Sequence, residues 1–157
     1  MATATTTLPA SPLSMVDTNV FVSALYSEEV QHPAAYRFVT QAESPDANLC
    51  ITPQIVTEFY STITNPRRVT SAFSVEEALQ EVEKILAYPG ITLLPVPIET
   101  IRRWIVLARQ YQVSRGDIFD TQLVATMLEH QVRRLYTFNV DDFIIYPDIE
   151  VLEPPTP

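Results

Sequence analysis

An aspartate follows a short apolar run near the start of this chain. The run ends at Val16, Asp17 follows it, and a second apolar run begins at Val20. This pattern predicts a buried strand that leads into a helix. In a parallel α/β sheet, ligands bind in the crevice outside the carboxyl ends of the strands. The sequence therefore places a carboxylate where such a fold has its ligand site.

Strand and helix signals alternate along the rest of the chain. A first strand is predicted to end at residue 17. Further strands are predicted to cover residues 49–51, 91–96, 132–137 and, at an edge of the sheet, 149–152. Thr52 before Pro53 predicts a capped helix start. Ser74 and Glu77 form a second start signal, a capping box. The alternation predicts a three-layer α/β fold with a parallel central sheet.

Two amphipathic segments late in the chain predict helices whose apolar stripes pack on the core. The first stripe contains Val75, Ala78, Leu79, Val82, Ile85 and Leu86. The second contains Ile98, Ile101, Ile105 and Ala108, with Trp104 beside it. A third apolar pattern, at residues 118–128, places Asp120 on the same stripe, which is an unusual position for an acid.

The 157 residues and the 46% hydrophobic content predict one folded domain over residues 15–152. Residues 1–14 and 153–157 are expected to form tails, the first of them disordered because it is rich in Thr, Ala, Pro and Ser. No apolar run approaches the roughly 20 residues of a membrane span, and the start does not resemble a signal peptide. We expect a cytoplasmic protein with no membrane contact, in which the single Cys50 is a buried thiol.

The formal net charge of −9 argues against non-specific adhesion to nucleic acid through a basic face. It does not exclude a nuclease, since bound cations reverse the local sign at a carboxylate site. The paired arginines, Arg67–Arg68 among them, have the geometry to contact phosphates. Solvated faces and carboxylate pairing explain such pairs equally well.

Four acids occupy corresponding positions near the predicted carboxyl edge of the sheet: Asp17, Glu58, Asp120 and Asp142. Carboxylates crowded together repel and raise each other's pKa values. Mg²⁺ or Mn²⁺ relieves that repulsion because hard divalent cations prefer oxygen ligands. Such a site can activate water and clamp the oxygens of a phosphodiester during in-line displacement.

Each acid also has a purely structural explanation. Asp17 can cap a helix, Glu58 can be solvated, Asp120 can favour a helix start through the dipole, and Asp142 can hold a turn. Independent caps have no reason to converge on one edge of one sheet, however. The convergence favours a metal site.

Four segments in this order resemble the motifs of PIN domains, most of all those of VapC-type toxins of bacterial toxin–antitoxin pairs. They are Met-Val-Asp-Thr-Asn-Val-Phe (15–21), Ile-Thr-Pro-Gln-Ile-Val-Thr-Glu-Phe (51–59), Asp-Thr-Gln-Leu-Val-Ala-Thr-Met-Leu (120–128) and Thr-Phe-Asn-Val-Asp-Asp-Phe (137–143). The resemblance implies strand order 3-2-1-4-5 and a Mg²⁺- or Mn²⁺-dependent endoribonuclease. It further implies an RNA substrate, a cognate antitoxin and a homodimer.

Carried over residue by residue, the resemblance implies that Asp17, Glu58, Asp120 and Asp142 are the catalytic and metal-binding acids. It assigns supporting positions to Asn19, Thr137 and Asn139. Two choices stay open, since Asp117 lies one turn before Asp120 and Asp141 adjoins Asp142, although Phe143 sets the register in favour of Asp142. Arg115 is a candidate phosphate contact, and a salt bridge is the alternative for it.

Other acidic-pocket enzymes fit less well. A haloacid dehalogenase phosphatase needs a second acid at the position of Asn19, and a response-regulator receiver needs a lysine after a late strand, whereas the only lysine is Lys84. The rival from another class is a catalytically inactive PIN fold that binds RNA or protein. Metal-dependent cleavage discriminates between this rival and the enzyme.

Overall fold

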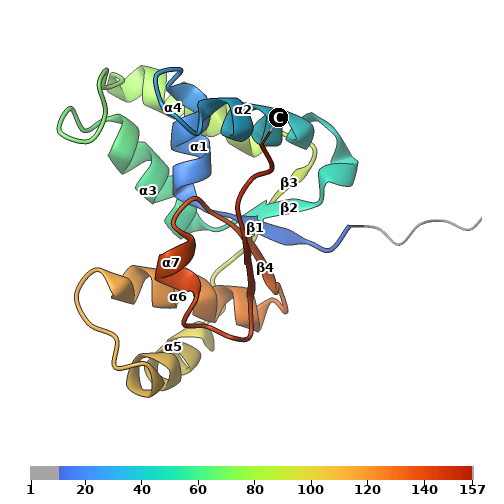
Figure 1. Ribbon diagram of the computed structural model, residues 1–157, viewed down its shortest axis with the longest axis vertical. Helices are drawn as coiled ribbons and strands as arrows, with labels where there is room; N and C mark the ends of the chain where they lie inside the picture. Colours follow the sequence, from blue (N-terminus) through green and yellow to red (C-terminus); the bar gives the residue numbers. More distant parts are fainter. Residues whose placement is uncertain (1–10, 157) are drawn as a thin grey trace, which may run out of the picture.

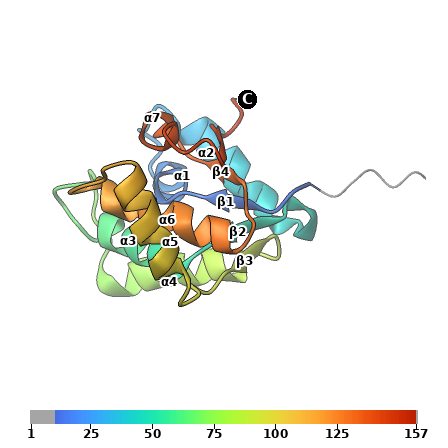
Figure 2. The same ribbon diagram turned by 90° about the horizontal axis from the view of Figure 1, so that it is seen from below.

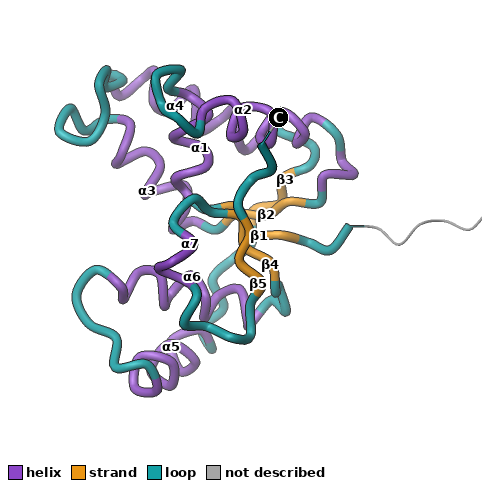
Figure 3. The backbone as a smooth tube through the Cα atoms, viewed as in Figure 1, coloured by secondary structure: helices purple, strands orange, loops and turns teal. Residues whose placement is uncertain are grey.

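The computed structural model describes residues 11–156, and over these residues the chain forms a five-stranded parallel sheet (Figure 1). The strands are β1 (Ser14–Val16), β2 (Leu49–Ile51), β3 (Ile91–Leu93), β4 (Arg134–Tyr136) and β5 (Glu150–Leu152). They lie in the order β3-β2-β1-β4-β5, with every neighbouring pair parallel. Figure 3 shows them together at the centre of the molecule. The predicted fold class and strand order are confirmed.

Helices cover both faces of this sheet. The helices are α1 (Thr18–Leu25), α2 (His32–Thr40), α3 (Pro53–Ile63), α4 (Val75–Ala87), α5 (Thr100–Gln110), α6 (Asp117–Glu129) and α7 (Val140–Phe143), with short 3-10 turns η1 (Gln41–Glu43) and η2 (Pro45–Ala47). Helices α1 to α4 lie on one side, and α5 and α6 lie on the other with α7 beside them (Figures 1 and 2). The change of side follows from the strand order, because right-handed crossovers reverse faces when the chain turns back from β3 to β4.

Local signals in the sequence set several of the element boundaries. Thr52 accepts the backbone N–H of Ile55 through its hydroxyl, so that α3 begins at Pro53 as predicted. Ser74 and Glu77 form the predicted capping box at the start of α4, with the Ser74 N–H donating to Glu77 Oε2 over 2.8 Å. Both caps satisfy backbone donors that the first helical turn leaves unpaired.

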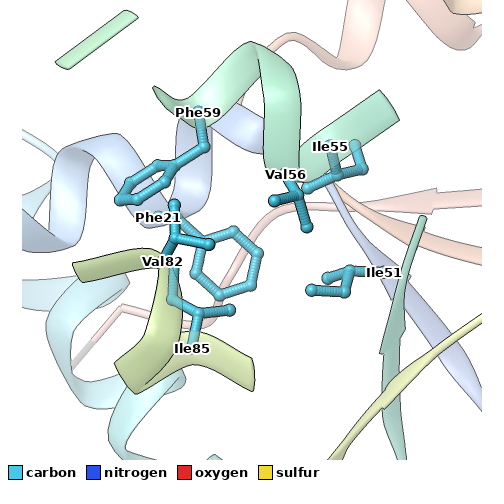
Figure 4. A pocket seen from close by; sticks show the side chains of 7 residues that line it. All are labelled: Phe21, Ile51, Ile55, Val56, Phe59, Val82 and Ile85. Atoms are coloured by element: carbon cyan, nitrogen blue, oxygen red, sulfur yellow. The ribbon is translucent and has the colours of Figure 1, made fainter. Parts of the chain in front are cut away.

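The core lies between the sheet and its two helical layers. Between β2 and helices α1, α3 and α4, apolar side chains enclose a cavity of only about 10 Å³, which Figure 4 shows. Phe21 and Phe59 meet there edge to face, with ring centroids 6.2 Å apart. Cys50 is fully buried in β2, and burial raises the pKa of its thiol to about 12. It is therefore the unreactive core thiol that the sequence predicted.

The two predicted apolar stripes are only partly buried: Val82, Ile85 and Trp104 pack against the core, and other members are exposed. In α4, Ala78 is the buried residue, whereas Val75 is 62% exposed. Around α5, Leu107 is buried, but Ile98 and Ile101 are 83% and 55% exposed. Leu79, Leu86 and Ile105 are also exposed. The helical period was read correctly, but periodicity marks an apolar face without showing what covers it.

The chain ends differ slightly from the predicted boundaries. Ser14, which the sequence placed in the tail, pairs with Leu49 and Arg134 as the first residue of β1. Most of the expected disordered segment, residues 1–10, lies outside the described residues. In the part described, Pro154 is buried although it follows β5 without regular structure. None of the described helices is long and apolar enough to cross a membrane.

Candidate active site

Asp17 joins the end of β1 to the start of α1. It is the N-cap of α1, and its Oδ1 accepts the backbone N–H of Thr18 over 2.7 Å. Its own N–H donates to the carbonyl of Tyr136 in β4. The side chain is only 9% exposed. A helix N-cap in this position thus holds a buried carboxylate at the carboxyl edge of the sheet, as the sequence predicted.

The end of β4 supplies hydrogen bonds that fix this carboxylate. The hydroxyl of Thr137 donates to Asp17 Oδ2 over 2.7 Å and accepts a bond from Asn19 Nδ2 over 3.0 Å. Asn19 Nδ2 also donates to Asp17 Oδ2, while its Oδ1 accepts the N–H of Phe138. The N–H of Asn139 donates to the Thr137 hydroxyl. The three predicted supporting residues therefore belong to one network, Asn139 through its backbone.

Glu58 reaches the same edge from α3. Its Oε2 accepts the hydroxyl of Thr18 over 3.2 Å, and its Oε1 accepts Gln54 Nε2 over 2.9 Å. Gln54 Nε2 also donates to the carbonyl of Phe119 in α6 over 2.9 Å. Gln54 therefore links helices from opposite layers. Sequence reasoning missed both Thr18 and Gln54, although Gln54 precedes Glu58 by the four residues that place helical side chains together.

Burial raises the pKa of Asp17 above its usual range, despite the hydrogen bonds from Thr137 and Thr18 that lower it. The negative charges of Glu58 and Asp142 raise it further. A carboxylate held by good donors would ordinarily have a low pKa, so burial and neighbouring charge outweigh those donors here.

Burial also raises the pKa of Asp120, to about 7. The charges of Asp17, Asp142, Glu58 and Asp117 contribute to the increase in that order. Asp120 stands in the first turn of α6 and is half-buried. The four predicted acids thus form one electrostatic group, drawn from α1, α3, α6 and α7.

The two residue choices that the sequence left open differ in their surroundings. Asp117 is exposed and is the weakest of the charges that act on Asp120. Asp141 and Asp142 are both exposed, but only the charge of Asp142 is among those that raise the pKa of Asp17 and of Asp120. The choice of Asp120 and Asp142 stays a prediction, and these electrostatic contributions are consistent with it.

A cleft of about 720 Å³ opens beside these acids. Asp17, Glu58 and Asp120 line it, and Asp142 lies outside its lining. Its walls come from α1 and α3 with the loop after α3 on one side and from α6 on the other. Arg115 is exposed, has a left-handed backbone with φ 56°, and does not line the cleft.

The chemistry of the acids suits a hard divalent cation. All four donors are carboxylates, the ligand type that Mg²⁺ and Mn²⁺ prefer. None of the ion pairs within residues 11–156 includes any of them, so their mutual repulsion has no basic partner to offset it. In the same range, no three His, Cys, Asp or Glu side chains are close enough together to hold an ion. The donors fit a cation by type and charge, without a closed cage.

A family model for the PIN domain matches residues 14–147. The chain belongs to the PIN domain family. The matched range covers all four motifs on which the predicted resemblance rested, and that prediction is confirmed. PIN domains are generally nucleases. The individual roles of the predicted residues remain predictions.

Solved structures of similar fold include toxin–antitoxin complexes and a toxin. A VapBC complex from Salmonella typhimurium, bound to DNA, matches with a TM-score of 0.64 and 15% identity, over 92% of this chain and 100% of that chain. VapC20 of Mycobacterium tuberculosis, described as a toxin that cleaves the sarcin–ricin loop, matches with a TM-score of 0.62 and 16% identity, over 84% and 94%.

A toxin–antitoxin complex from Klebsiella pneumoniae matches with a TM-score of 0.59 and 19% identity, over 92% of this chain and 99% of that chain. At these identities the matches establish a shared fold. A sequence comparison with curated proteins gives no match.

Proposed function

We propose that this PIN domain is a Mg²⁺- or Mn²⁺-dependent endoribonuclease and the toxin of a toxin–antitoxin pair. The observation that carries the proposal is the group of four acids, three of which line the cleft. Burial and the charges of the other acids raise the pKa of Asp120, and none of the four forms an ion pair within residues 11–156. Uncompensated carboxylates in one place are costly for a fold, and a cation at the site offsets that cost.

Asp17 and Asp142 are the expected direct ligands, with Glu58 and Asp120 completing the site. When bound, a divalent cation supplies positive charge at the phosphodiester and lowers the pKa of water. The chain's own contribution is orientation. Thr137 and Asn19 hold Asp17, while Thr18 and Gln54 hold Glu58. A carboxylate that is fixed before substrate arrives costs no reorganisation during the reaction.

The proposal includes two protein partners. The structural neighbours from Klebsiella pneumoniae and Salmonella typhimurium are complexes with antitoxins, which supports an antitoxin for this chain; an arginine from such a partner would pair well with the free carboxylates. A homodimer is supported by the apolar side chains that α4 and α5 leave exposed. Light scattering on the purified chain tests the dimer. Native co-purification tests the antitoxin.

One observation favours the alternative, a catalytically inactive PIN module that binds RNA or protein. No three acids in residues 11–156 are close enough to hold an ion. If the acids stay this far apart when metal is present, the protein has the four acidic residues but does not catalyse cleavage.

The deciding experiment is cleavage of pooled cellular RNA by purified protein freed of any antitoxin. Wild type is assayed with Mn²⁺ and with EDTA, alongside Asp142→Asn and the matched control Asp141→Asn. We expect cleavage by wild type and Asp141→Asn in Mn²⁺ only, and none by Asp142→Asn. Cleavage that persists in EDTA, or in Asp142→Asn, contradicts the metal-site proposal. Absence of cleavage by folded wild type in Mn²⁺ supports the binding module.

A further inference from the structure

Tyr146 joins the two segments that carry the last two candidate acids. It follows α7, which holds Asp142, and its N–H donates to the carbonyl of Phe143 over 3.1 Å. Its hydroxyl lies 2.8 Å from the hydroxyl of Thr121 in α6. Because Thr121 comes directly after Asp120, one side-chain hydrogen bond connects the segment of Asp142 to that of Asp120.

The direction of this hydrogen bond follows from the other bond that Thr121 makes. The Thr121 hydroxyl donates to the carbonyl of Asp117 over 2.8 Å. A threonine hydroxyl has one proton to donate, so Tyr146 is the donor in the bond between the two hydroxyls. Burial raises the pKa of the Tyr146 phenol above its ordinary value of 10.0, the bond to Thr121 lowers it, and the charges of Asp120 and Asp117 raise it further. The phenol therefore stays protonated, and able to donate, near neutral pH.

Both partners of this bond are shielded from water. Tyr146 is 3% exposed and Thr121 is fully buried. Removal of one hydroxyl therefore leaves the other unpaired inside the protein. The Tyr146 ring also meets the ring of Tyr111 at the end of α5 edge to face, with centroids 5.2 Å apart. This contact holds the ring on a second side and so fixes the direction of its hydroxyl.

Asp142 depends on such a contact for its position. It stands on α7, a helix of four residues that packs against α6 (Figure 1). A helix this short does not form by itself. Phe143 anchors α7 by burial in the core, but apolar burial has no preferred direction. Within residues 11–156, the bond of Tyr146 is the one side-chain hydrogen bond between α6 and residues 140–149.

We propose that Tyr146 is a positioning residue for the metal site, where its hydrogen bond to Thr121 sets the distance between the carboxylates of Asp120 and Asp142. The inference rests on the proposed function and adds a residue outside the four acids and outside the lining of the cleft. Mg²⁺ demands near-ideal geometry of its oxygen ligands. Without the bond, α7 can shift relative to α6, and the site loses affinity for the cation.

A purely structural role is the alternative, since a buried tyrosine also stabilises the core. The two roles differ in their effect on metal affinity. A structural residue changes the free energy of unfolding and leaves the affinity of the folded protein for Mn²⁺ as it was. A positioning residue changes this affinity as well.

The test measures Mn²⁺ binding to the purified protein, without RNA, from the electron paramagnetic resonance signal of free Mn²⁺. Tyr146→Phe removes the hydroxyl and keeps the ring. Tyr26→Phe is its matched control, because Tyr26 is 6% exposed, donates to the carbonyl of Ser71 over 3.0 Å, and meets Phe73 edge to face at 6.1 Å. Tyr26 does not line the cleft. Urea unfolding in EDTA compares the stability of both variants with that of wild type.

We expect Tyr146→Phe to weaken Mn²⁺ binding about 10-fold, the lower end of the usual effect of removing a residue that orients metal ligands. Tyr26→Phe should bind Mn²⁺ as wild type does. Both variants should lose free energy of unfolding in EDTA, because each leaves a buried acceptor without its donor. The difference between the two variants is thus expected in metal affinity.

Substitutions at Thr121 test the other partner of the bond, and they decide the question if Tyr146→Phe does not fold. Thr121→Val lacks the acceptor and should weaken Mn²⁺ binding as Tyr146→Phe does, whereas Thr121→Ser keeps the hydroxyl and should bind as wild type. Thr126→Val is the control, since it also removes a bond to a carbonyl one turn back in α6. The double variant of Tyr146→Phe and Thr121→Val should lose no more affinity than either single one, because both break the same bond.

Three results overturn the inference and leave the metal site standing. They are wild-type Mn²⁺ affinity in Tyr146→Phe, equal losses of affinity in Tyr146→Phe and Tyr26→Phe, and additive losses in the double variant. If wild type itself binds no Mn²⁺, the metal site is wrong and the inference fails with the proposed function. The titration of wild type therefore separates the two failures.

Discussion

Thr137 donates a hydrogen bond to Asp17 Oδ2 over 2.7 Å, and this bond joins the carboxyl ends of β4 and β1. The hydroxyl is completely buried and also accepts bonds from Asn19 and from the backbone of Asn139. One hydroxyl thus organises the loop after β4 around the buried acid. Because β4 lies beside β1, the hydroxyl of Thr137 in the last of the four motifs can bond Asp17 in the first.

Thr137→Val should destabilise the protein by about 1–3 kcal/mol, because it leaves the buried Asp17 carboxylate short of a donor at nearly unchanged volume. Urea unfolding in EDTA measures the change. Thr126→Val is the matched control, since Thr126 is equally buried but bonds only to the carbonyl of Gln122 within its own helix. If both variants lose the same free energy of unfolding, the hydrogen bond from Thr137 to Asp17 stabilises the protein no more than the bond within the helix does.

Gln54→Leu should lower the cleavage rate by about 10-fold or more, the usual effect of removing a group that orients an acid at a metal site. The substitution frees Glu58 Oε1 and breaks the link to the Phe119 carbonyl. Rates in Mn²⁺ are compared with those of Gln80→Leu, which alters an exposed glutamine on α4. If Gln54→Leu cleaves RNA as fast as Gln80→Leu does, Gln54 does not orient Glu58 for catalysis.

Without metal, the free energy of unfolding should fall as the pH rises from about 4 to 7. The pKa of Asp120 is raised to about 7 in the folded state from an ordinary value of 3.8. Between these values the folded protein binds the proton and the unfolded chain does not. Protonation therefore favours folding below this window, and the advantage is lost as Asp120 ionises. The raised pKa of Asp17 acts in the same direction.

Thermal unfolding in EDTA across that pH range measures the slope. Asp120→Asn should flatten it, whereas Asp117→Asn should change it little, because Asp117 is exposed and is the weakest charge acting on Asp120. Mn²⁺ should also flatten the slope and raise the melting temperature, since a ligand that binds only the folded state stabilises it. A slope that survives Asp120→Asn would assign the pH dependence to other groups.

The sequence predicted the fold well where the signals are local. The bounds of β2, the cap at Thr52 and the capping box at Ser74 were read correctly because each depends on a few adjacent residues. In the stripe from Ile98 to Ile105 the three isoleucines are exposed, whereas Trp104 packs against the core. Burial depends on which element packs against a helix, and periodicity does not contain that information.

The candidate site, too, was predicted only in part from the sequence. The convergence of Asp17, Glu58 and Asp120 followed from strand ends that meet at one edge, together with motif order. The bridge from Gln54 to Phe119 and the approach of Arg68 to the cleft could not be predicted. They depend on how the layer of α3 sits against the layer of α6, which no spacing within one segment specifies.

The two glycines of the chain make a matched pair for the last prediction. Gly90 precedes β3, where its N–H donates to the carbonyl of Ala42 over 2.8 Å. A Cβ at Gly90 would lie 2.3 Å from the Ser44 carbonyl oxygen and 2.9 Å from that of Ala42. Backbone atoms cannot move aside as a flexible side chain would, so the close approach requires glycine.

Gly90→Ala should therefore cost about 1–3 kcal/mol or more, the price of forcing extra volume into a packed site. Gly116→Ala should be neutral or stabilising by up to about 1 kcal/mol, because its φ is −61°, no atom lies within 4 Å of the added Cβ, and alanine reduces the entropy of the unfolded chain. Urea midpoints of both variants give the comparison. If the Gly90→Ala protein is as stable as the Gly116→Ala protein, the segment 42–47 can move away from the added methyl group. This segment would then not fix the register between β3 and β2.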